Sequence, residues 1–168
     1  RELAVRDNLT GLYNTRYLYE ALARLIAASA AAGTTLSVIM TDLDRFKRVV
    51  DRYGHLNGSR VIQEVAATVR GCVEAPAFAV AYAGDEFVIV LPGAGNRAAR
   101  EKAEAIRARI AATTFLREAG HAIRLTASFG VATYPEDASD LEGLLSLAAG
   151  RLFDVKGRGR NAVAARSR

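Results

Sequence analysis

The chain has 168 residues, of which 51% are hydrophobic and 24% are charged, and these proportions are typical of one globular domain with a substantial core. A single cysteine excludes an internal disulfide and favours a reducing, cytoplasmic compartment, and no apolar run is long enough to cross a membrane. The net charge of +5 comes from dispersed arginines and lysines without any tryptophan, so we favour an anionic small-molecule substrate over a nucleic-acid partner.

The spacing of apolar residues and the positions of glycine and proline predict helices and strands along the chain. We interpret residues 1–6 as the end of a linker from an upstream module, and residues 7–14 as an ordered loop. The predicted elements are, in order, a helix over 17–32, a strand over 36–42, a helix over 44–53, a break over 54–59, a helix over 59–73, a hairpin with strands over 78–80 and 87–91, a helix over 97–113, a strand over 123–132, a helix over 139–155 and a short strand over 162–165. Hairpins mixed with helical crossovers predict an α+β fold, with a central, mostly antiparallel five-stranded sheet flanked by helices.

Acidic residues occupy two of the predicted strand ends. Asp85 and Glu86 follow Gly84 at the tip of the hairpin, and Asp42 ends the first strand. Carboxylates are hard oxygen ligands that suit Mg²⁺ far better than zinc. If the first strand pairs beside the hairpin, Asp42 and Asp85 can share two metal ions, an arrangement that serves in-line phosphoryl or nucleotidyl transfer. Taken separately, each pattern also fits a solvated acidic turn or a helix cap, so the prediction depends on this pairing.

Six short motifs follow one another along the chain. They are D-N-L-T-G-L-Y-N over 7–14, D-L-D-R-F-K over 42–47, G-H with a later glycine over 54–58, A-G-D-E-F over 83–87, S-F-G-V over 128–131, and a lysine at 156 followed by G-R-N over 159–161. Together and in this order, these motifs resemble one family, the GGDEF-domain diguanylate cyclases. Each motif alone is weakly specific, but six of them in the family's order are highly specific, and the match runs almost from end to end.

The resemblance implies a fold like the palm of polymerases and of class III nucleotide cyclases. It also implies that two nucleoside triphosphates, normally two GTP, are condensed into a cyclic dinucleotide, normally cyclic di-GMP. Each subunit of such an enzyme holds one nucleotide, so a homodimer is implied, together with an upstream sensory or receiver module.

The same resemblance assigns roles to residues of this chain. Asp42, Asp85 and the carbonyl of Leu43 would hold Mg²⁺ (or Mn²⁺), and Glu86 would be a further metal ligand or help to remove the hydroxyl proton. Asp42, Asp85 and Glu86 are therefore the expected catalytic residues. The expected nucleotide-binding residues are Phe46, Lys47, Val50, Ser59, Gly84, Lys156 and Arg160, of which Lys47, Lys156 and Arg160 would hold phosphates.

Three positions depart from the family pattern. Ala83 replaces the leading glycine of the signature, which matters only if that position needs a positive φ. Val50 and Ser59 replace the asparagine and aspartate with which guanine-binding members contact the base. Residues 74–77, with the sequence E-A-P-A, replace the R-x-x-D of an inhibitory product-binding site, so we expect no tight feedback binding there.

The changed base contacts leave two functional hypotheses open. One is a cyclase with relaxed purine choice, similar to the subgroup that makes mixed cyclic GMP-AMP, because a serine hydroxyl can donate or accept a hydrogen bond and valine can do neither. The other is a degenerate domain that binds nucleotide, or only a protein partner, without turnover.

Overall fold

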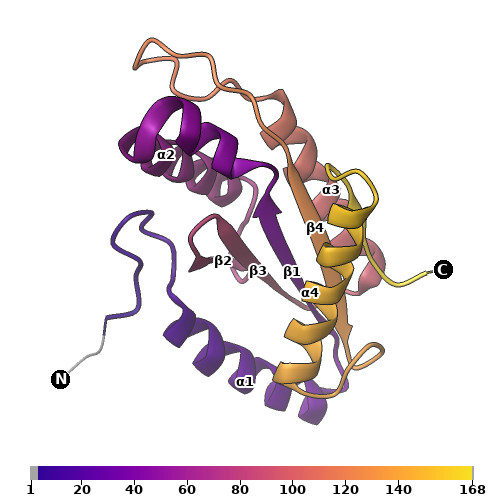
Figure 1. The fold of residues 1–168 in the computed structure, drawn as a ribbon. Coiled ribbons are helices and arrows are strands. Elements are labelled where there is room, and N and C mark those ends of the chain that lie inside the picture. The colour runs from indigo at the N-terminus through magenta and orange to yellow at the C-terminus, as the bar shows by residue number, and fades with distance from the viewer. Residues whose placement is uncertain (1–3, 168) are drawn as a thin grey trace.

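The computed structural model describes residues 4–167 and contains one five-stranded sheet with helices on both of its faces (Figure 1). The elements are, in chain order, α1 (Thr15–Ala32), β1 (Leu36–Leu43), α2 (Phe46–Gly71), β2 (Phe78–Ala83), β3 (Glu86–Pro92), α3 (Asn96–Ala112), β4 (Ala127–Tyr134), α4 (Leu141–Gly157) and β5 (Val163–Ala164). The strands lie in the order β2-β3-β1-β4-β5, and each neighbouring pair is antiparallel except β4 and β5. The predicted α+β fold with its mostly antiparallel sheet is confirmed.

Two apolar layers hold the sheet, one on each face. Helices α2 and α3 pack on one face through a cluster that includes Ile39 and Phe129, whereas α1 and α4 cover the other face around Val38 and Val88. Val38 and Ile39 enter different layers because successive residues of a strand point to opposite faces. Since both faces are covered, β1 and β4 are buried along almost their whole length. None of the helices that the structure describes is both long and apolar enough to cross a membrane.

Strand β1 is central in the sheet, and its last residues meet acidic and polar partners on both sides. Asp42 lies opposite Glu86 of β3 and opposite Ser128 of β4. The predicted pairing of the first strand beside the hairpin is therefore confirmed. Figure 1 shows the tip of β1, the start of α2 and the loop after α4 at the same end of the molecule. Segments that are distant in the sequence thus meet where the central strand β1 ends.

The structure confirms a break between the second and third predicted helices but confines it to one residue. Within α2 (Phe46–Gly71), two helical segments meet at a kink at Gly54, which departs from helical geometry with φ of 88° and ψ of 166°. Glycine adopts a positive φ without steric cost, so this one residue takes up a kink for which the sequence indicates a loop over 54–59. The side chain of Asn57 donates to the carbonyl oxygen of Tyr53 across the kink, at 3.0 Å.

The strand predicted over 123–132 is wrong in its first part. Strand β4 begins only at Ala127, and Ile123 instead pairs with Phe115 in an isolated bridge outside the sheet. The alternation of apolar residues before β4 has another cause, because Ile123 and Leu125 are buried in the layer formed by α2 and α3. The segment that precedes β4 arches over α2 (Figure 1).

The described part of the predicted linker, residues 4–6, packs on the domain. The backbone N–H of Asn14 donates to the carbonyl oxygen of Val5 at 2.8 Å. Arg6 pairs with Tyr13 in an isolated bridge, and its guanidinium lies 3.9 Å from the centre of the Tyr13 ring. Residues 1–3, which belong to the same prediction, lie outside the described residues.

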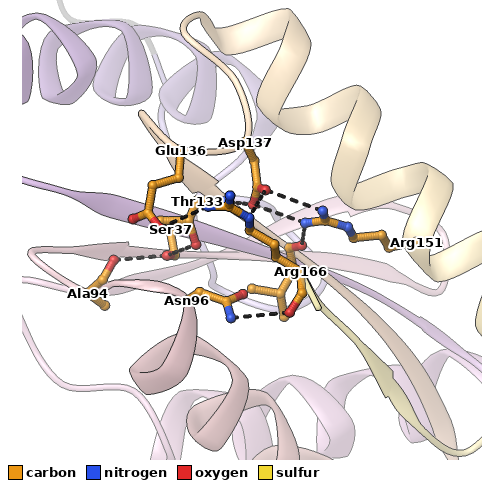
Figure 2. Close-up of polar contacts among 9 residues, drawn as sticks. Ser37, Ala94, Asn96, Thr133, Glu136, Asp137, Arg151 and Arg166 are labelled. Atoms are coloured by element: carbon orange, nitrogen blue, oxygen red, sulfur yellow. Dashed lines mark hydrogen bonds and ion pairs between the residues drawn. The ribbon is translucent and has the colours of Figure 1, made fainter. Parts of the chain in front are cut away.

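A polar network fixes the C-terminal segment at the far end of β4 (Figure 2). The buried carboxylate of Asp137 accepts hydrogen bonds from the backbone N–H of Thr133 at 2.8 Å and from Nη1 of Arg151 at 3.0 Å. Arg166, which follows β5, lies 3.1 Å from Glu136 and 4.0 Å from Asp137. Burial acts to raise the pKa of Asp137, but the hydrogen bonds from Arg151 and Thr133 outweigh it and hold the pKa below its ordinary value. The network ties α4 and the segment after β5 to the turn that follows β4.

Candidate active site

The β2–β3 hairpin carries the acidic pair at its tip. Ala83 pairs with Glu86, which leaves Gly84 and Asp85 as the turn. Gly84 has a positive φ of 42°, whereas Ala83 lies in β2 and is not among the residues with positive φ. The methyl group of Ala83 therefore meets no backbone restriction, and the hairpin forms without the glycine that the family motif has at this position.

Three carboxylates, those of Asp42, Asp85 and Glu86, belong to adjoining positions of β1 and the hairpin. The backbone N–H of Leu43 donates to the carbonyl oxygen of Asp85 at 3.2 Å and so ties the turn to β1. Burial raises the pKa of Asp42 to about 7, repulsion from Asp85 adds to this effect, and Lys156 opposes it. Burial and the charge of Asp85 also raise the pKa of Glu86. Because the site disfavours its own negative charge, it favours the binding of a cation.

One oxygen of Asp42 indicates where such a cation fits. Its Oδ1 atom is buried and accepts no hydrogen bond from the residues that the structure describes, whereas Oδ2 lies 3.5 Å from Nζ of Lys156. Within the described part of the chain, no three histidine, cysteine, aspartate or glutamate side chains form a group that could hold an ion. A cation would therefore need other oxygens as well, such as the Leu43 carbonyl and the phosphates of a ligand. Mg²⁺ is commonly bound in this way, by one or two carboxylates together with substrate phosphates.

A buried carboxylate that the sequence analysis missed, Asp44, connects the end of β1 to the loop after α4. Its side chain is 3% exposed. It accepts hydrogen bonds from the hydroxyls of Thr126 at 2.6 Å and Ser128 at 2.7 Å. It also accepts from the backbone N–H of Asn161 at 3.0 Å and from Nζ of Lys156 at 3.3 Å. The available signal in the sequence is the second acid of the D-x-D motif.

Lys156 lies beside the acids in the last turn of α4, and Arg160 lies in the loop that follows this helix. Nζ of Lys156 lies between two carboxylates, 3.5 Å from Asp42 and 3.3 Å from Asp44. Arg160 is half-buried and has a positive φ of 69°, and its backbone N–H donates to the carbonyl oxygen of Val155 at 3.0 Å. Arg160 borders a cavity of about 270 Å³ together with Asp44. The other arginines that line this cavity are Arg45, Arg48 and Arg124.

The predicted base-binding residues gather on the two sides of the kink in α2. A Cβ atom at Gly58 would lie 3.0 Å from Cγ2 of Val50 and 3.4 Å from Cζ of Phe46. Phe46 and Val50 therefore pack closely on Gly58 and form an apolar surface. Ser59 follows Gly58 in the chain and is half-buried.

The structure does not bring every predicted phosphate ligand together. Lys47 is 87% exposed, and its ammonium group lies 2.9 Å from Asp51 of the next helical turn. It is therefore paired on the surface of α2 and not with Lys156 and Arg160. Its role in phosphate binding stays a prediction.

A larger cavity lies elsewhere in the molecule. It has a volume of about 810 Å³ at the start of α3 and is lined by Asn96, Arg97, Arg100 and Glu136 among others, but by none of the three acids described above. The surroundings of Asp42, unlike this cavity, combine desolvated carboxylates with a neighbouring cation, Lys156.

The sheet topology, the acids at the end of its central strand and the basic loop beside them define a palm-type α+β domain, the class that includes polymerases and nucleotide cyclases. Comparison with known families places the chain within this class more narrowly. The chain belongs to the GGDEF-domain family of diguanylate cyclases, whose family model, "Diguanylate cyclase, GGDEF domain", matches residues 4–162.

Individual relatives agree with this membership. The chain is 34% identical over 163 residues to the response regulator PleD of Caulobacter vibrioides, with 96% of this chain and 36% of PleD covered. It is 36% identical over 157 residues to the diguanylate cyclase DosC of Escherichia coli, with 94% of this chain and 34% of DosC covered. The chain thus spans about a third of the length of these curated relatives. The crystal structure of the GGDEF domain of DgcB from Caulobacter crescentus in complex with c-di-GMP is similar, with a TM-score of 0.89, 29% identity and coverage of 98% of this chain and 94% of that one.

Proposed function

We propose that this chain is a single GGDEF domain that condenses two purine nucleoside triphosphates into a cyclic dinucleotide in the cytoplasm. The observation that carries the proposal is the meeting of Asp42 with Glu86 across β1 and β3 and with Lys156 at 3.5 Å, in a member of the GGDEF family. The names of two similar proteins support it, since DosC is a diguanylate cyclase and the DgcB domain was solved with c-di-GMP.

We assign Mg²⁺, or Mn²⁺ in its place, to Asp42, Asp85 and the carbonyl oxygen of Leu43, with Glu86 either as a further ligand or as the group that removes the hydroxyl proton. The unpartnered, buried Oδ1 atom of Asp42 supports this assignment. When bound, the ion would supply positive charge that neutralises the phosphates and polarises them toward attack.

The protein's own residues would bind the triphosphate and accept a proton. Lys156 and Arg160 would hold phosphate oxygens, Lys156 as a compact point charge and Arg160 through its planar fork of donors. The bare backbone of Gly84 would let a phosphate come close to the hairpin turn. Glu86 is a candidate base for the attacking hydroxyl, because its raised pKa brings it closer to the working pH.

The proposed reaction needs two nucleotides that face each other. In each half of the reaction, the 3′-oxygen of one nucleotide forms a bond to the α-phosphorus of the other and loses its proton. The bond from that phosphorus to the β-phosphate oxygen breaks, and pyrophosphate leaves. Since each domain would hold one nucleotide, we propose a homodimer whose pairing is controlled by an upstream sensory or receiver module. The description of PleD as a response regulator supports control of this kind.

We propose that the choice of purine base is relaxed, so that GTP is used and ATP can take its place. Val50 presents only methyl groups to the base site, and Ser59 offers one hydroxyl that can donate or accept. A hydrogen bond to a charged partner contributes about 1.5–3 kcal/mol, so the absence of a carboxylate here should reduce guanine selectivity by tenfold or more. The expected products are cyclic di-GMP from GTP and mixed cyclic GMP-AMP from GTP with ATP.

The second candidate function is nucleotide or protein binding without turnover. The apolar contact of Val50 with Gly58 favours it, since the base would be held by fewer polar groups and would be oriented less firmly. Against it stands the arrangement of Asp42, Asp44 and Lys156, for which a domain that only binds a protein partner has no chemical need.

Product analysis tests the proposal. The domain, dimerised through a fused coiled coil, is incubated with Mg²⁺ and GTP, ATP or an equal mixture, and the products are separated by chromatography. We expect cyclic di-GMP from GTP, an additional mixed product from the mixture, and loss of both in Asp85→Ala with an unchanged circular dichroism spectrum. Cyclic di-GMP alone at normal efficiency would contradict the relaxed base site. No cyclic dinucleotide from any mixture would leave only the binding function.

A further inference from the structure

We propose that Asp44 is the positioning residue for the phosphate-binding cations, in that it holds Lys156 and the turn that carries Arg160 at the edge of the acid site. This inference rests on the proposed function, because it assumes that the two cations bind a triphosphate. Asp44 itself touches neither substrate nor metal in this assignment. Its effect on the reaction would pass entirely through the loop after α4.

The hydrogen-bond pattern of Asp44 is specific for a carboxylate. Each oxygen accepts from one hydroxyl and from one group that can only donate. Oδ1 accepts from the hydroxyl of Ser128 at 2.7 Å and from the ammonium group of Lys156 at 3.3 Å. Oδ2 accepts from the hydroxyl of Thr126 at 2.6 Å and from the backbone N–H of Asn161 at 3.0 Å. A hydroxyl can rotate so that it either donates or accepts a hydrogen bond, but an ammonium group and a backbone N–H can only donate.

These four hydrogen bonds also explain why Asp44 has less capacity to bind a metal ion than Asp42, two residues earlier in the chain. Both oxygens of Asp44 are occupied, and its side chain is 3% exposed, so little capacity remains for a metal ion. Asp42 keeps one buried oxygen without a partner among the described residues. The two acids of the D-x-D motif therefore have separate tasks, one open to a cation and the other closed around the basic loop.

The basic loop needs such an anchor because its backbone is unfavourable by itself. Gly159, Arg160 and Asn161 all have positive φ, at 118°, 69° and 50°. Residues other than glycine are sterically disfavoured in this region, although asparagine tolerates it better than most. The N–H of Asn161 is held by Oδ2 of Asp44 and by the hydroxyl of Ser128 at 3.2 Å. Without these acceptors the turn is free to relax, and Arg160 moves with it.

Asp44→Asn is the variant that isolates this role. The amide has the same shape, but one of its two positions becomes an NH₂ group. In one orientation the NH₂ group faces Lys156, and in the other it faces the N–H of Asn161, so either orientation sets a donor against an obligatory donor. The binding of a triphosphate should weaken, while the binding of the base, which the proposal assigns to α2, should not.

Affinity measurements with two probes separate these effects. The full chain is titrated calorimetrically, in the presence of Mg²⁺, with GMP and with a GTP analogue whose α,β-bridging oxygen is replaced by methylene. We expect Asp44→Asn to lower the affinity for the analogue by about tenfold, the equivalent of about 1.4 kcal/mol. The affinity for GMP should stay within about twofold of the wild-type value. Ser128→Ala, which removes one donor to Asp44 and one acceptor for Asn161, should weaken the analogue in the same direction by a smaller factor. It also serves as the test if Asp44→Asn does not fold.

Asp137→Asn is the matched control at the opposite end of β4. Asp137 is also a buried carboxylate, with 4% side-chain exposure, and it also holds a backbone N–H and a basic side chain (Figure 2). Its loss should lower the melting temperature without changing the ratio of analogue to GMP affinity. If Asp44→Asn and Asp137→Asn change that ratio equally, or if Asp44→Asn weakens both probes alike, Asp44 is only structural and the inference fails. If the wild-type chain itself binds the analogue no better than GMP, the proposed function fails first, whatever the variants do.

Discussion

At the scale of single residues, Asp42 is held in an environment that disfavours its charge. Burial raises its pKa from 3.8 to about 7, with a further contribution from Asp85. Between these two values the folded protein binds more protons at this position than the unfolded chain does. The free energy of unfolding should therefore fall as the pH rises through this interval in the absence of metal.

Asp42→Asn should consequently stabilise the metal-free domain at neutral and higher pH. We expect the free energy of unfolding to rise by about 1–2 kcal/mol near pH 8, a value reduced from the full pKa shift to allow for solvent screening, and to change little near pH 4. Urea unfolding in the presence of EDTA measures both values. A destabilised variant at pH 8, or an equal difference at both pH values, would contradict the desolvation of Asp42.

The sequence indicated the acids of this site better than their supports. Asp42, Asp85 and Glu86 could be placed because each follows or begins a strongly apolar strand. Asp44 could not, because its partners Thr126 and Ser128 lie just before and just inside β4, a strand whose register the sequence does not determine. The surface pairing of Lys47 with Asp51 was not predicted, although the two residues lie four apart on the predicted helix over 44–53, where side chains of opposite charge can meet.

At the scale of elements, the backbone of α4 lies very close to β4 at Gly130. A Cβ atom on Gly130 of β4 would lie 2.5 Å from the backbone nitrogen of Leu152 and still closer to the carbonyl oxygen of Ala148. Backbone atoms cannot move aside as a flexible side chain can. The position therefore needs glycine because of this close approach, although its φ is not positive.

Gly130→Ala should destabilise the domain by at least about 2 kcal/mol, because it forces α4 away from the sheet. Gly150→Ala is a matched control on α4 itself, since a Cβ atom there meets nothing within 4 Å. Alanine is the better helix former, so this second change should stabilise by about 0.5–1 kcal/mol. Denaturant unfolding measures the free energy of unfolding of both variants. An equal change in the two would contradict the close contact between α4 and β4.

Element boundaries show where local pattern stops being informative. The strong apolar periodicity of α1 and the β-branched run of β1 predicted both elements closely. The break in α2 lies where it was predicted, but its length was overestimated, because Gly54 alone turns the chain without a loop. The start of β4 was placed too early, because apolar residues that cover α2 follow the same alternation as a strand.

At the scale of the whole molecule, we propose that segments distant in the sequence build one site for phosphate and metal. The end of β1, the tip of the β2–β3 hairpin and the loop after α4 meet at the same end of the molecule (Figure 1). The acids at the strand ends predicted that β1 and the hairpin meet, but the place of Lys156 was predicted only through the family resemblance, since nothing in the local sequence states that residue 156 lies beside residue 42. No motif in the sequence predicted the network of Asp137 and Arg166 at the opposite end of β4 (Figure 2).

The most direct measurement is a crystal structure of the domain with Mn²⁺ and the methylene-bridged GTP analogue, in which anomalous scattering locates the ion. We expect the ion to be bonded to Oδ1 of Asp42 and to a carboxylate of the hairpin, with the phosphates on Lys156 and Arg160. An ion or a triphosphate bound elsewhere, with Oδ1 of Asp42 still unpartnered, would contradict the proposed site.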